Sequence, residues 1–484
     1  MSWMRNSHGG DRHRKAVGDK GLKVAFYSFG GCEGCSYELL NLDEALLNAI
    51  EKYGVEIAHS VVFGVPSESK DYDVAFVEGT IASEEDADKI REVREKSKAL
   101  VAMGSCAALS GIPGLRRFTK EDDIGRVYAG VELEHKPLEE AFPLNKFVKV
   151  DYHLRGCPTN KTEFVELLDK LASGKWWRQG ERRFDYSREK TFDIEGTAVT
   201  LDGEKCYVCG RCVKICEGIT NAIDYANRSV DTIVSTPFKV KFDESSCISC
   251  GQCTLYCPVG AMKERSSVKE VQRVLKAGEN PTAYVEPEVI AGLGETLGVE
   301  KDVGGKLATV LRRLGFKKVI LWRPQNRLRL DDLTIVPSSE AEARFVELFY
   351  PDLVRYMIEP PEVKEENAVW LTSCVARKLG KNLALTTREL IRLMGTLDLS
   401  LETVGWFDKA LLKEENEDEF VATGISGIRE TLEKIRKKSV KKGTVKLYCC
   451  PDGCLNGGGQ PFADSELGEK RKQILAQILR REEK

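Results

Sequence analysis

Short apolar runs and a helical pattern alternate along the first third of the chain. Residues 22–28 (LKVAFYS) read as a buried strand, and residues 29–50 then turn into a helix whose apolar positions recur about every 3.6 residues. Two more strand-like runs follow at residues 73–79 (DVAFVEG) and 99–106 (ALVAMGSC). This alternation predicts a parallel sheet with helices on both faces, and such sheets bind their ligands outside the carboxyl ends of the strands.

Four cysteines fall at these predicted strand ends and turns. They are Cys32, Cys35, Cys106 and Cys157. Thiolates that converge at one edge of a sheet would hold one 4Fe-4S cluster. Cysteines are also common as buried, unreactive residues, so the spacing alone leaves inert burial as the alternative.

Length and composition narrow the class of protein. A chain of 484 residues, 42% of them hydrophobic, is expected to form two to four domains. The chain shows no apolar run near the roughly 18 residues that span a bilayer and no secretory signal, so we expect a cytoplasmic protein without a membrane span. The net charge of -3 would not attract nucleic acid, and residues 1–20 are expected to be a basic, disordered tail.

The sixteen cysteines favour metal or redox chemistry over disulfides, because the cytosol keeps thiols reduced. Residues 206–216 (CYVCGRCVKIC) and 247–258 (CISCGQCTLYCP) each contain a C-x2-C-x2-C-x3-C run. In two-cluster ferredoxins, the fourth cysteine of each run binds the other 4Fe-4S cluster. Structural zinc is the weaker alternative, because zinc ribbons use two C-x2-C pairs. The crossed ligand sets are Cys206, Cys209, Cys212 and Cys257 for one cluster, and Cys247, Cys250, Cys253 and Cys216 for the other.

A further cysteine-rich stretch lies near the end of the chain. Residues 448–461 (YCCPDGCLNGGGQP) place three cysteines immediately before three glycines. Adjacent cysteines suit disulfide geometry badly, and a glycine loop buries little apolar surface, so packing alone does not explain the cluster. We expect this loop to wrap a bound group.

Three segments of the first third carry a family resemblance: CEGCSYELL (32–40), GSCAALSGIPGL (104–115) and RGCPTNKTEFVELL (155–168). They resemble the small subunit of nickel-iron hydrogenases and its 20 kDa relative in respiratory complex I. The resemblance implies a flavodoxin-like fold whose proximal 4Fe-4S cluster, held by the four cysteines of this third, faces a separate large subunit with the nickel site. That site requires four cysteines, and this chain has none uncommitted, so a partner chain is implied.

The rest of the chain is similar to iron-only (FeFe) hydrogenases. Residues 220–264 look like the accessory cluster domain of that family, and residues 285–319, 383–394, 421–428 and 449–461 resemble its catalytic domain. In that family three cysteine loops hold a 4Fe-4S cube that is bridged to a two-iron site. By this resemblance, Cys374, Cys450 and Cys454 occupy ligand positions.

Other positions depart from the family pattern. Ser338 and Ser339 stand where the family has a cysteine pair, Arg377 replaces the lysine that holds a cyanide ligand, and Gly380 replaces a glutamate of the proton relay. Proton delivery needs groups within hydrogen-bond reach, and glycine offers none. These changes argue against hydrogen activation in this domain.

One cysteine, Cys449, stands where the family has a small apolar residue. We hypothesise that it compensates for the missing ligand, so that a fourth 4Fe-4S cluster is bound by Cys374, Cys449, Cys450 and Cys454. Adjacent cysteines on one cube require a strained backbone, so Ser339 as an oxygen ligand is the rival interpretation. A site without any cluster is the third.

The predicted fold is α/β and multidomain. We expect a tail at 1–20, a flavodoxin-like small-subunit domain at 21–178, a linker at 179–197, an α+β ferredoxin-like two-cluster domain at 198–265, and a degenerate α/β iron-only-hydrogenase domain at 266–484. No nickel, flavin or NAD site is expected in the chain; the segment GLGETLG at 292–298 misses the dinucleotide-binding pattern by one residue.

The predicted function is that of a non-catalytic electron-transfer subunit of a cytoplasmic nickel-iron hydrogenase complex. The expected partners are a nickel-iron large subunit, flavin- or NAD(P)-binding and other iron-sulfur subunits, and ferredoxin, in a complex of the electron-bifurcating kind. One alternative is a catalytically active iron-only hydrogenase with an unusual site. The other is an electron-transfer subunit of a redox complex outside hydrogen metabolism.

Overall fold

The computed structural model describes most of the chain. The described residues are 21–42, 44–66, 71–118, 137–173, 193–228, 231–296, 303–323, 333–380, 383–394, 406–411, 419–462 and 465–482. They form two compact units. The N-terminal unit comprises residues 1–191, 204–214 and 225–234, and the C-terminal unit comprises residues 192–203, 215–224 and 235–484. The predicted tail (1–20) and most of the predicted linker (179–197) lie outside the described residues, and the predicted domain boundaries stay a prediction.

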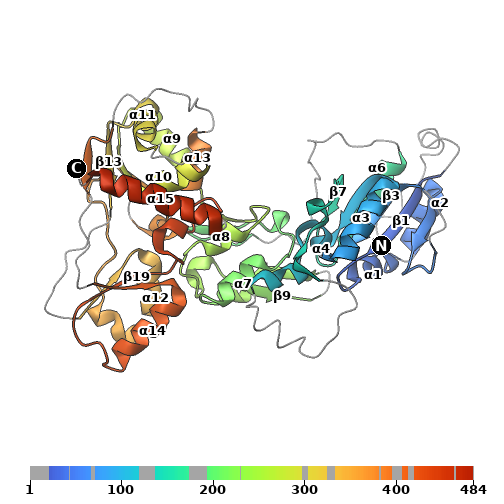
Figure 1. The fold of residues 1–484 in the computed structure, drawn as a ribbon, viewed down its shortest axis with the longest axis horizontal. Helices are drawn as coiled ribbons and strands as arrows, with labels where there is room; N and C mark the ends of the chain where they lie inside the picture. Colours follow the sequence, from blue (N-terminus) through green and yellow to red (C-terminus); the bar gives the residue numbers. More distant parts are fainter. Residues whose placement is uncertain are drawn as a thin grey trace. The chain divides into compact units, whose positions relative to one another are not determined.

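A five-stranded parallel sheet forms the centre of the N-terminal unit (Figure 1). Its strand order is β2-β1-β3-β5-β7. The strands are β1 (Lys23–Ser28), β2 (Glu56–Ser60), β3 (Tyr72–Glu78), β5 (Ser97–Met103) and β7 (Tyr152–Leu154). With the strands of this sheet renumbered in chain order, the order is 2-1-3-4-5, which is that of flavodoxin-like folds. The predicted parallel sheet is confirmed.

Helices cover both faces of this sheet, and the alternation of strand residues explains why. On β1, Val24 and Phe26 pack with one helix group, whereas Ala25 and Tyr27 pack with the other, since successive side chains of a strand point to opposite faces. The first group is α1 (Gly34–Leu40), α2 (Glu44–Tyr53) and α6 (Lys161–Ala172), and the second is α3 (Glu84–Glu95) and α4 (Gly104–Leu109). A separate antiparallel pair is made by β4 (Ile81–Ser83) and β6 (Pro137–Phe142).

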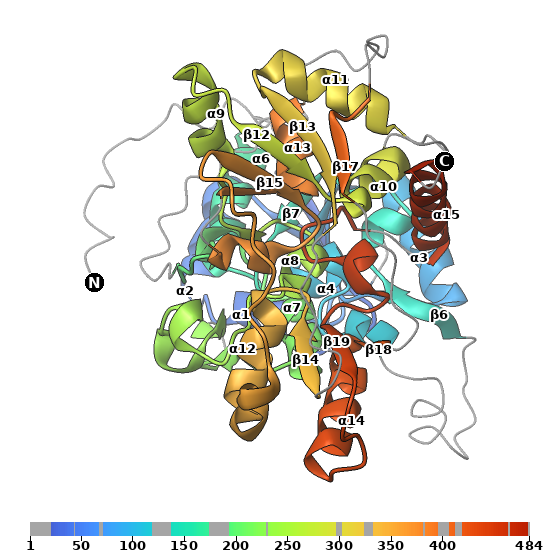
Figure 2. The same ribbon diagram turned by 90° about the vertical axis from the view of Figure 1, so that its left-hand side faces the viewer.

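The C-terminal unit contains two parallel sheets, which Figure 2 shows as separate groups of strands. The larger has the order β16-β15-β12-β13-β17 and the smaller has the order β14-β19-β18. The larger sheet consists of β12 (Thr282–Val285), β13 (Lys318–Trp322), β15 (Ala368–Thr372), β16 (Leu383–Thr386) and β17 (Lys409–Leu411). The smaller consists of β14 (Thr334–Pro337), β18 (Glu419–Thr423) and β19 (Thr444–Tyr448).

Each of these sheets has its own helices and its own apolar core. The larger sheet packs with α9 (Val268–Lys276), α10 (Pro287–Thr296), α11 (Gly304–Leu314), α13 (Thr387–Met394) and α15 (Ser465–Glu482). The smaller packs with α12 (Glu340–Phe349) and α14 (Gly424–Arg436). The predicted α/β class of this part of the chain is therefore confirmed.

The two cysteine runs at 206–216 and 247–258 lie on short loops and helices. Helix α7 (Arg211–Glu217) follows the first run's loop and α8 (Gln252–Tyr256) follows the second. Strands β8 (Val199–Leu201) and β11 (Met262–Glu264) pair antiparallel in the C-terminal unit, and the short strands β9 (Asp224–Ala226) and β10 (Ile233–Ser235) pair with each other. Across the described residues, no helix combines the length and apolar character needed to span a membrane.

A buried ion pair joins several elements of the larger C-terminal sheet. Lys378 Nζ lies 2.8 Å from Glu389 Oε2, and the two side chains are 3% and 0% exposed. The carboxylate also accepts hydrogen bonds from the backbone N–H groups of Ser267 (2.7 Å) and Thr386 (2.8 Å). Burial lowers the pKa of Lys378, and Glu389 opposes that shift. Each buried charge of this pair is stabilised by the opposite charge of its partner.

Substitution Lys378→Met is expected to destabilise the chain by about 3–5 kcal/mol, because it leaves the Glu389 carboxylate buried without its cation. The measurement is the urea midpoint of unfolding. Lys434→Met is the matched control, since the Lys434–Glu430 pair is solvent-exposed with side chains 56% and 69% accessible. We expect no measurable shift for the control, and an equal effect of the two variants would contradict the prediction.

Candidate iron-sulfur sites

All sixteen cysteines of the chain are described, and none is paired in a disulfide. Four of them lie at the carboxyl ends of the N-terminal sheet, as the sequence predicted. Cys32 follows β1, Cys35 lies in α1, Cys106 lies in α4 directly after β5, and Cys157 follows β7. The loops approach each other closely, since a Cβ atom on Gly104 would lie 2.5 Å from Cys35 Sγ. Only glycine fits there, and its φ of +73° also favours glycine.

The four thiols influence one another electrostatically. Burial raises the pKa of Cys35, with further contributions from Glu78, Cys106 and Cys157. Burial likewise raises the pKa of Cys106 to about 12, and Cys157 and Cys32 add to the shift. The pKa of Cys157 is raised by burial and by Cys32. Thiols with raised pKa values stay protonated until a metal cation displaces their protons. The resulting thiolates are the donors that iron requires.

Sequence reasoning missed a carboxylate at this site. Glu78, the last residue of β3, is 3% exposed and accepts hydrogen bonds from the backbone N–H groups of Cys35 (3.1 Å) and Ser36 (3.4 Å), and from the Ser36 hydroxyl. Burial raises the pKa of this carboxyl. The signal in the sequence was an acidic residue at the end of an otherwise apolar strand. Glu78 positions the loop that carries Cys35.

The two ferredoxin-type runs are divided between the units. Cys206, Cys209 and Cys212 belong to the N-terminal unit, and Gly210 has a φ of +77° in their loop. Cys216 and the whole second run belong to the C-terminal unit. The predicted inclusion of Cys257 with the first run stays a prediction.

Within the C-terminal unit, three of the four cysteines of the second predicted ligand set, Cys216, Cys247 and Cys250, influence one another electrostatically. Burial raises the pKa of Cys247 to about 11, and Cys216 adds to the shift. Burial raises the pKa of Cys250 strongly, with contributions from Cys450, Cys247 and Cys216. Backbone N–H groups point at the sulfurs: Ser249 N lies 3.3 Å from Cys247 Sγ, and Ala222 N lies 3.2 Å from Cys216 Sγ. Cys216 is thus placed with the run that follows it, as a crossed arrangement requires.

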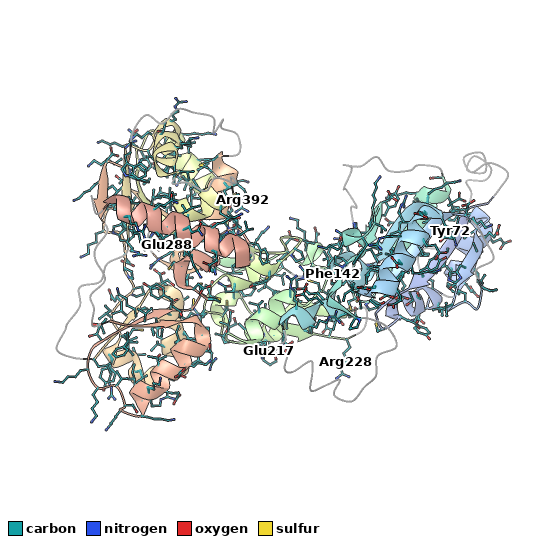
Figure 3. All side chains as sticks on the ribbon, viewed as in Figure 1. Tyr72, Phe142, Glu217, Arg228, Glu288 and Arg392 are labelled. Carbon is teal, nitrogen blue, oxygen red and sulfur yellow. The ribbon has the colours of Figure 1, made fainter. Side chains whose placement is uncertain are left out.

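The last four cysteines also gather in the C-terminal unit. Cys374 follows β15, Cys449 and Cys450 follow β19, and Cys454 lies in the short 3-10 helix η9 (Gly453–Asn456). Burial raises the pKa of Cys374, and Cys450 contributes to the rise. The pKa of Cys454 is raised by burial, by Glu288 of α10 (Figure 3) and Glu286, and by Cys374 and Cys450. Cys449 Sγ lies 4.0 Å from Cys450 Sγ.

The rival ligand, Ser339, lies at the same place. It caps the N-terminus of α12: its hydroxyl donates to Glu342 Oε2 (2.7 Å) and accepts from the backbone N–H of Ala341 (3.3 Å). Burial raises the pKa of Cys374, and the nearby Ser339 side chain partly offsets that rise. The other oxygen of Glu342 accepts from Cys449 N (2.6 Å). Ser339 therefore has a capping role that explains its presence without a metal, whereas the Cys449 thiol has no comparable role.

Arg377 and Glu286 form a buried charge network beside these thiols. The guanidinium is 4.2 Å from the Trp370 ring centre and lies 3.9 Å from Glu286 and 3.7 Å from Glu340. Glu286 also accepts from Trp370 Nε1 (3.0 Å) and Ser373 N (3.0 Å). The sequence indicated Arg377 only as a substitution; the acidic partners were missed because they come from distant segments.

Among the described residues, no group of three or more His, Cys, Asp or Glu side chains has the geometry of a site for one metal ion. A 4Fe-4S cube is larger than one ion, so its thiolates stand farther apart than the ligands of a single ion do. The fit to cubes rests on the donor chemistry, which is sets of mutually interacting thiols whose exposure ranges from exposed (Cys32) to buried (Cys374). The assignment of individual ligands stays a prediction.

The comparisons with known proteins agree with this architecture. Residues 32–171 match the family described as NADH ubiquinone oxidoreductase, 20 Kd subunit, and residues 205–261 match the 4Fe-4S dicluster domain. A subunit of the F420-non-reducing hydrogenase vhu of Methanococcus voltae is 31% identical over 209 residues, which are 38% of this chain and 70% of that protein. The corresponding protein from Methanocaldococcus jannaschii is 37% identical over 166 residues, which span 32% of this chain and only 57% of that relative.

A longer match extends beyond the first domain. The NADP-reducing hydrogenase subunit HndD of Solidesulfovibrio fructosivorans is 24% identical over 397 residues, which cover 57% of this chain and 67% of that protein. The fold and the cysteine sets define an iron-sulfur protein of the electron-transport class. The chain belongs to the hydrogenase family, as the sequence predicted, and combines a 20 Kd-type domain with a 4Fe-4S dicluster domain.

The variants Cys449→Ala and Ser339→Ala distinguish the two candidate ligands of the last site. We expect Cys449→Ala to lose about four of sixteen irons, because one thiolate of a cube is removed. Ser339→Ala is expected to keep its iron and to lose about 1 kcal/mol of stability through the helix cap. Iron and sulfide analysis after anaerobic purification measures the first effect, and urea unfolding measures the second.

Ser338→Ala serves as the control, since Ser338 contributes a backbone N–H to Leu447 O (3.0 Å) that survives the change. Loss of iron in Ser339→Ala with full iron in Cys449→Ala would assign the ligand to serine.

Proposed function

We propose that this chain is an electron-transfer subunit of a nickel-iron hydrogenase complex, and that four 4Fe-4S clusters bound to its sixteen cysteines relay electrons towards partner subunits. The gathering of interacting thiols at one edge of the N-terminal sheet and in the C-terminal unit is the observation that carries the proposal. When bound, the clusters accept and release single electrons. The protein supplies thiolates, N–H donors and a low-dielectric surrounding.

Contact between two of these sets supports a relay. In the C-terminal unit, a Cβ atom on Gly251 would lie 3.3 Å from Gly458 Cα, and one on Gly458 would collide with the Cys250 carbonyl oxygen. Two glycines therefore let the loop of Cys250 lie directly against the loop of Cys450. Arg388 holds these two loops together, since its Nη2 donates to Gly458 O (2.8 Å) and to Thr254 Oγ1 (2.6 Å). The short path favours electron transfer between the two sites.

The charge network beside the last thiols supports a relay role rather than hydrogen activation. Arg377 is held by carboxylates and by Trp370, so its guanidinium already has partners. Gly380 itself offers no group that could carry a proton. We therefore place hydrogen chemistry on a partner subunit with a nickel site.

The names of the relatives suggest the rest of the complex. Besides the NADP-reducing HndD, the delta subunit of the NAD-reducing hydrogenase HoxS of Cupriavidus necator is 29% identical over 169 residues, 80% of that protein. The proposed partners of this chain are a nickel-iron large subunit, a flavin- or NAD(P)-binding subunit, other iron-sulfur subunits and ferredoxin. The proposed location is the cytoplasm. We propose further that the complex is of the electron-bifurcating kind.

The sequence resemblance of residues 285–319 and 449–461 to iron-only hydrogenases favours one second candidate, an iron-only hydrogenase with an unusual site. The cysteines Cys374, Cys450 and Cys454, which lie together, are compatible with it. The missing cysteine pair at Ser338 and Ser339 argues against it.

Anaerobic purification of the chain followed by infrared spectroscopy separates the two candidates. We expect about sixteen irons per chain, four for each cube, and no bands in the carbonyl and cyanide region. We also expect no hydrogen uptake with artificial acceptors until a nickel-containing subunit is added. Carbonyl and cyanide bands in the isolated chain would overturn the relay proposal for the last domain.

A further inference from the structure

Gln252 connects two thiol sites of the C-terminal unit. It is the first residue of α8, lies between Cys250 and Cys253 in the chain, and is 5% exposed. Its side-chain Nε2 donates to Cys450 Sγ at 3.2 Å and to the Asn456 carbonyl at 3.0 Å. The amide thus reaches from the second ferredoxin-type loop into the cysteine loop of the last domain.

The chemistry of the site determines the orientation of this amide. Both neighbours, a cysteine sulfur and a backbone carbonyl, accept hydrogen bonds, and only the NH2 end of a glutamine side chain can donate two. The opposite orientation would turn the amide oxygen towards a carbonyl oxygen and lose both bonds. Nε2 therefore faces Cys450.

The surrounding contacts hold the donor in place. Thr254 Oγ1, two residues along α8, donates to Gly458 O at 3.1 Å, and Arg388 Nη2 bonds the same carbonyl and Thr254 Oγ1. Arg388 also lies 2.6 Å from Glu264, which is 3% exposed. Both loops are fixed relative to each other, so the N–H···S contact does not depend on a mobile side chain.

The donor to Cys450 differs from the backbone donors at other sulfurs. Val208 and Met262 donate backbone N–H groups to cysteines of their own loops, over 2 and 5 residues. The Gln252 bond spans 198 residues and comes from a side chain. A hydrogen bond to a ligating sulfur stabilises the reduced cluster, which carries more negative charge, and so raises its reduction potential.

We propose that Gln252 is a positioning residue that raises the reduction potential of the cluster bound by Cys450 relative to the cluster at Cys250. The inference rests on the proposed function, because it requires the fourth cluster. Its consequence is that the equilibrium of an electron shared by the two sites shifts towards the Cys450 site. The effect belongs to the protein and is independent of the partner subunits.

The test is a redox titration of the anaerobic full chain, followed by electron paramagnetic resonance, with Gln252→Met. Methionine keeps an unbranched side chain of similar length and removes the N–H donor. The fourth-cluster signal is identified as the one that Cys374→Ala lacks. At a fixed applied potential near its midpoint, we expect its reduced-to-oxidised ratio to fall about tenfold, a shift of about 59 mV for one electron.

Thr254→Val is the matched control, because it disturbs the same helix and the same contact with Gly458 but touches no sulfur. The bonds of Arg388 to Gly458 O and Glu264 remain and still hold the two loops together, so this variant is expected to leave the potential unchanged. If Gln252→Met does not retain its iron, Gln252→Asn, whose shorter amide cannot reach Cys450, is expected to show the same fall.

An unchanged fourth-cluster potential in an iron-replete Gln252 variant would overturn the inference while leaving the proposed relay intact. An equal shift in Thr254→Val would also overturn it, because the cause would then be packing. About twelve irons in the wild-type chain, three cubes instead of four, would overturn the proposed function and this inference together.

Discussion

The convergence of thiols in buried sites is the constraint on which the rest of the structure depends. Burial alone raises the pKa of Cys35, Cys106 and Cys374, and the approach of neighbouring thiols raises it further. Without a strong cationic group at such sites, these thiols would stay protonated. Their close approach to one another would then add no stabilising interaction. The close packing at Gly104 and Gly458 shows that the backbone is arranged for this approach.

The two units achieve convergence in related ways. In both, cysteines follow parallel strands at their carboxyl ends: Cys106 and Cys157 after β5 and β7, Cys374 after β15 and Cys450 after β19. Parallel strands deliver several loops to one edge of a sheet, whereas antiparallel strands alternate between edges. The ferredoxin-type runs use tight loops before short helices instead. Two strategies for collecting thiols are therefore combined in one chain.

Polar side chains around the thiols make two kinds of contact. Glu78, Glu342 and Gln252 each bond a cysteine-bearing loop directly, at a backbone N–H or at a sulfur. Arg377 and Glu286 instead lie 3.9 Å apart in a buried charge network next to the last cysteines. The first kind of contact fixes the conformation of the cysteine loops. The second places a pair of oppositely charged side chains in the buried space beside them. Both are compatible with electron transfer, since neither requires a group to move.

The sequence by itself determined the features that depend on residues close together in the chain. The apolar runs LKVAFYS and DVAFVEG predicted β1 and β3, and the spacing of the two cysteine runs predicted the dicluster domain. Only the tertiary structure decided the contacts between distant segments. Gln252 and Cys450 are 198 residues apart, and Cys449 and Glu342 are 107 apart, so no local pattern connects them. Such contacts depend on how sheets and loops pack, which is a property of the whole fold and not of any one stretch of residues.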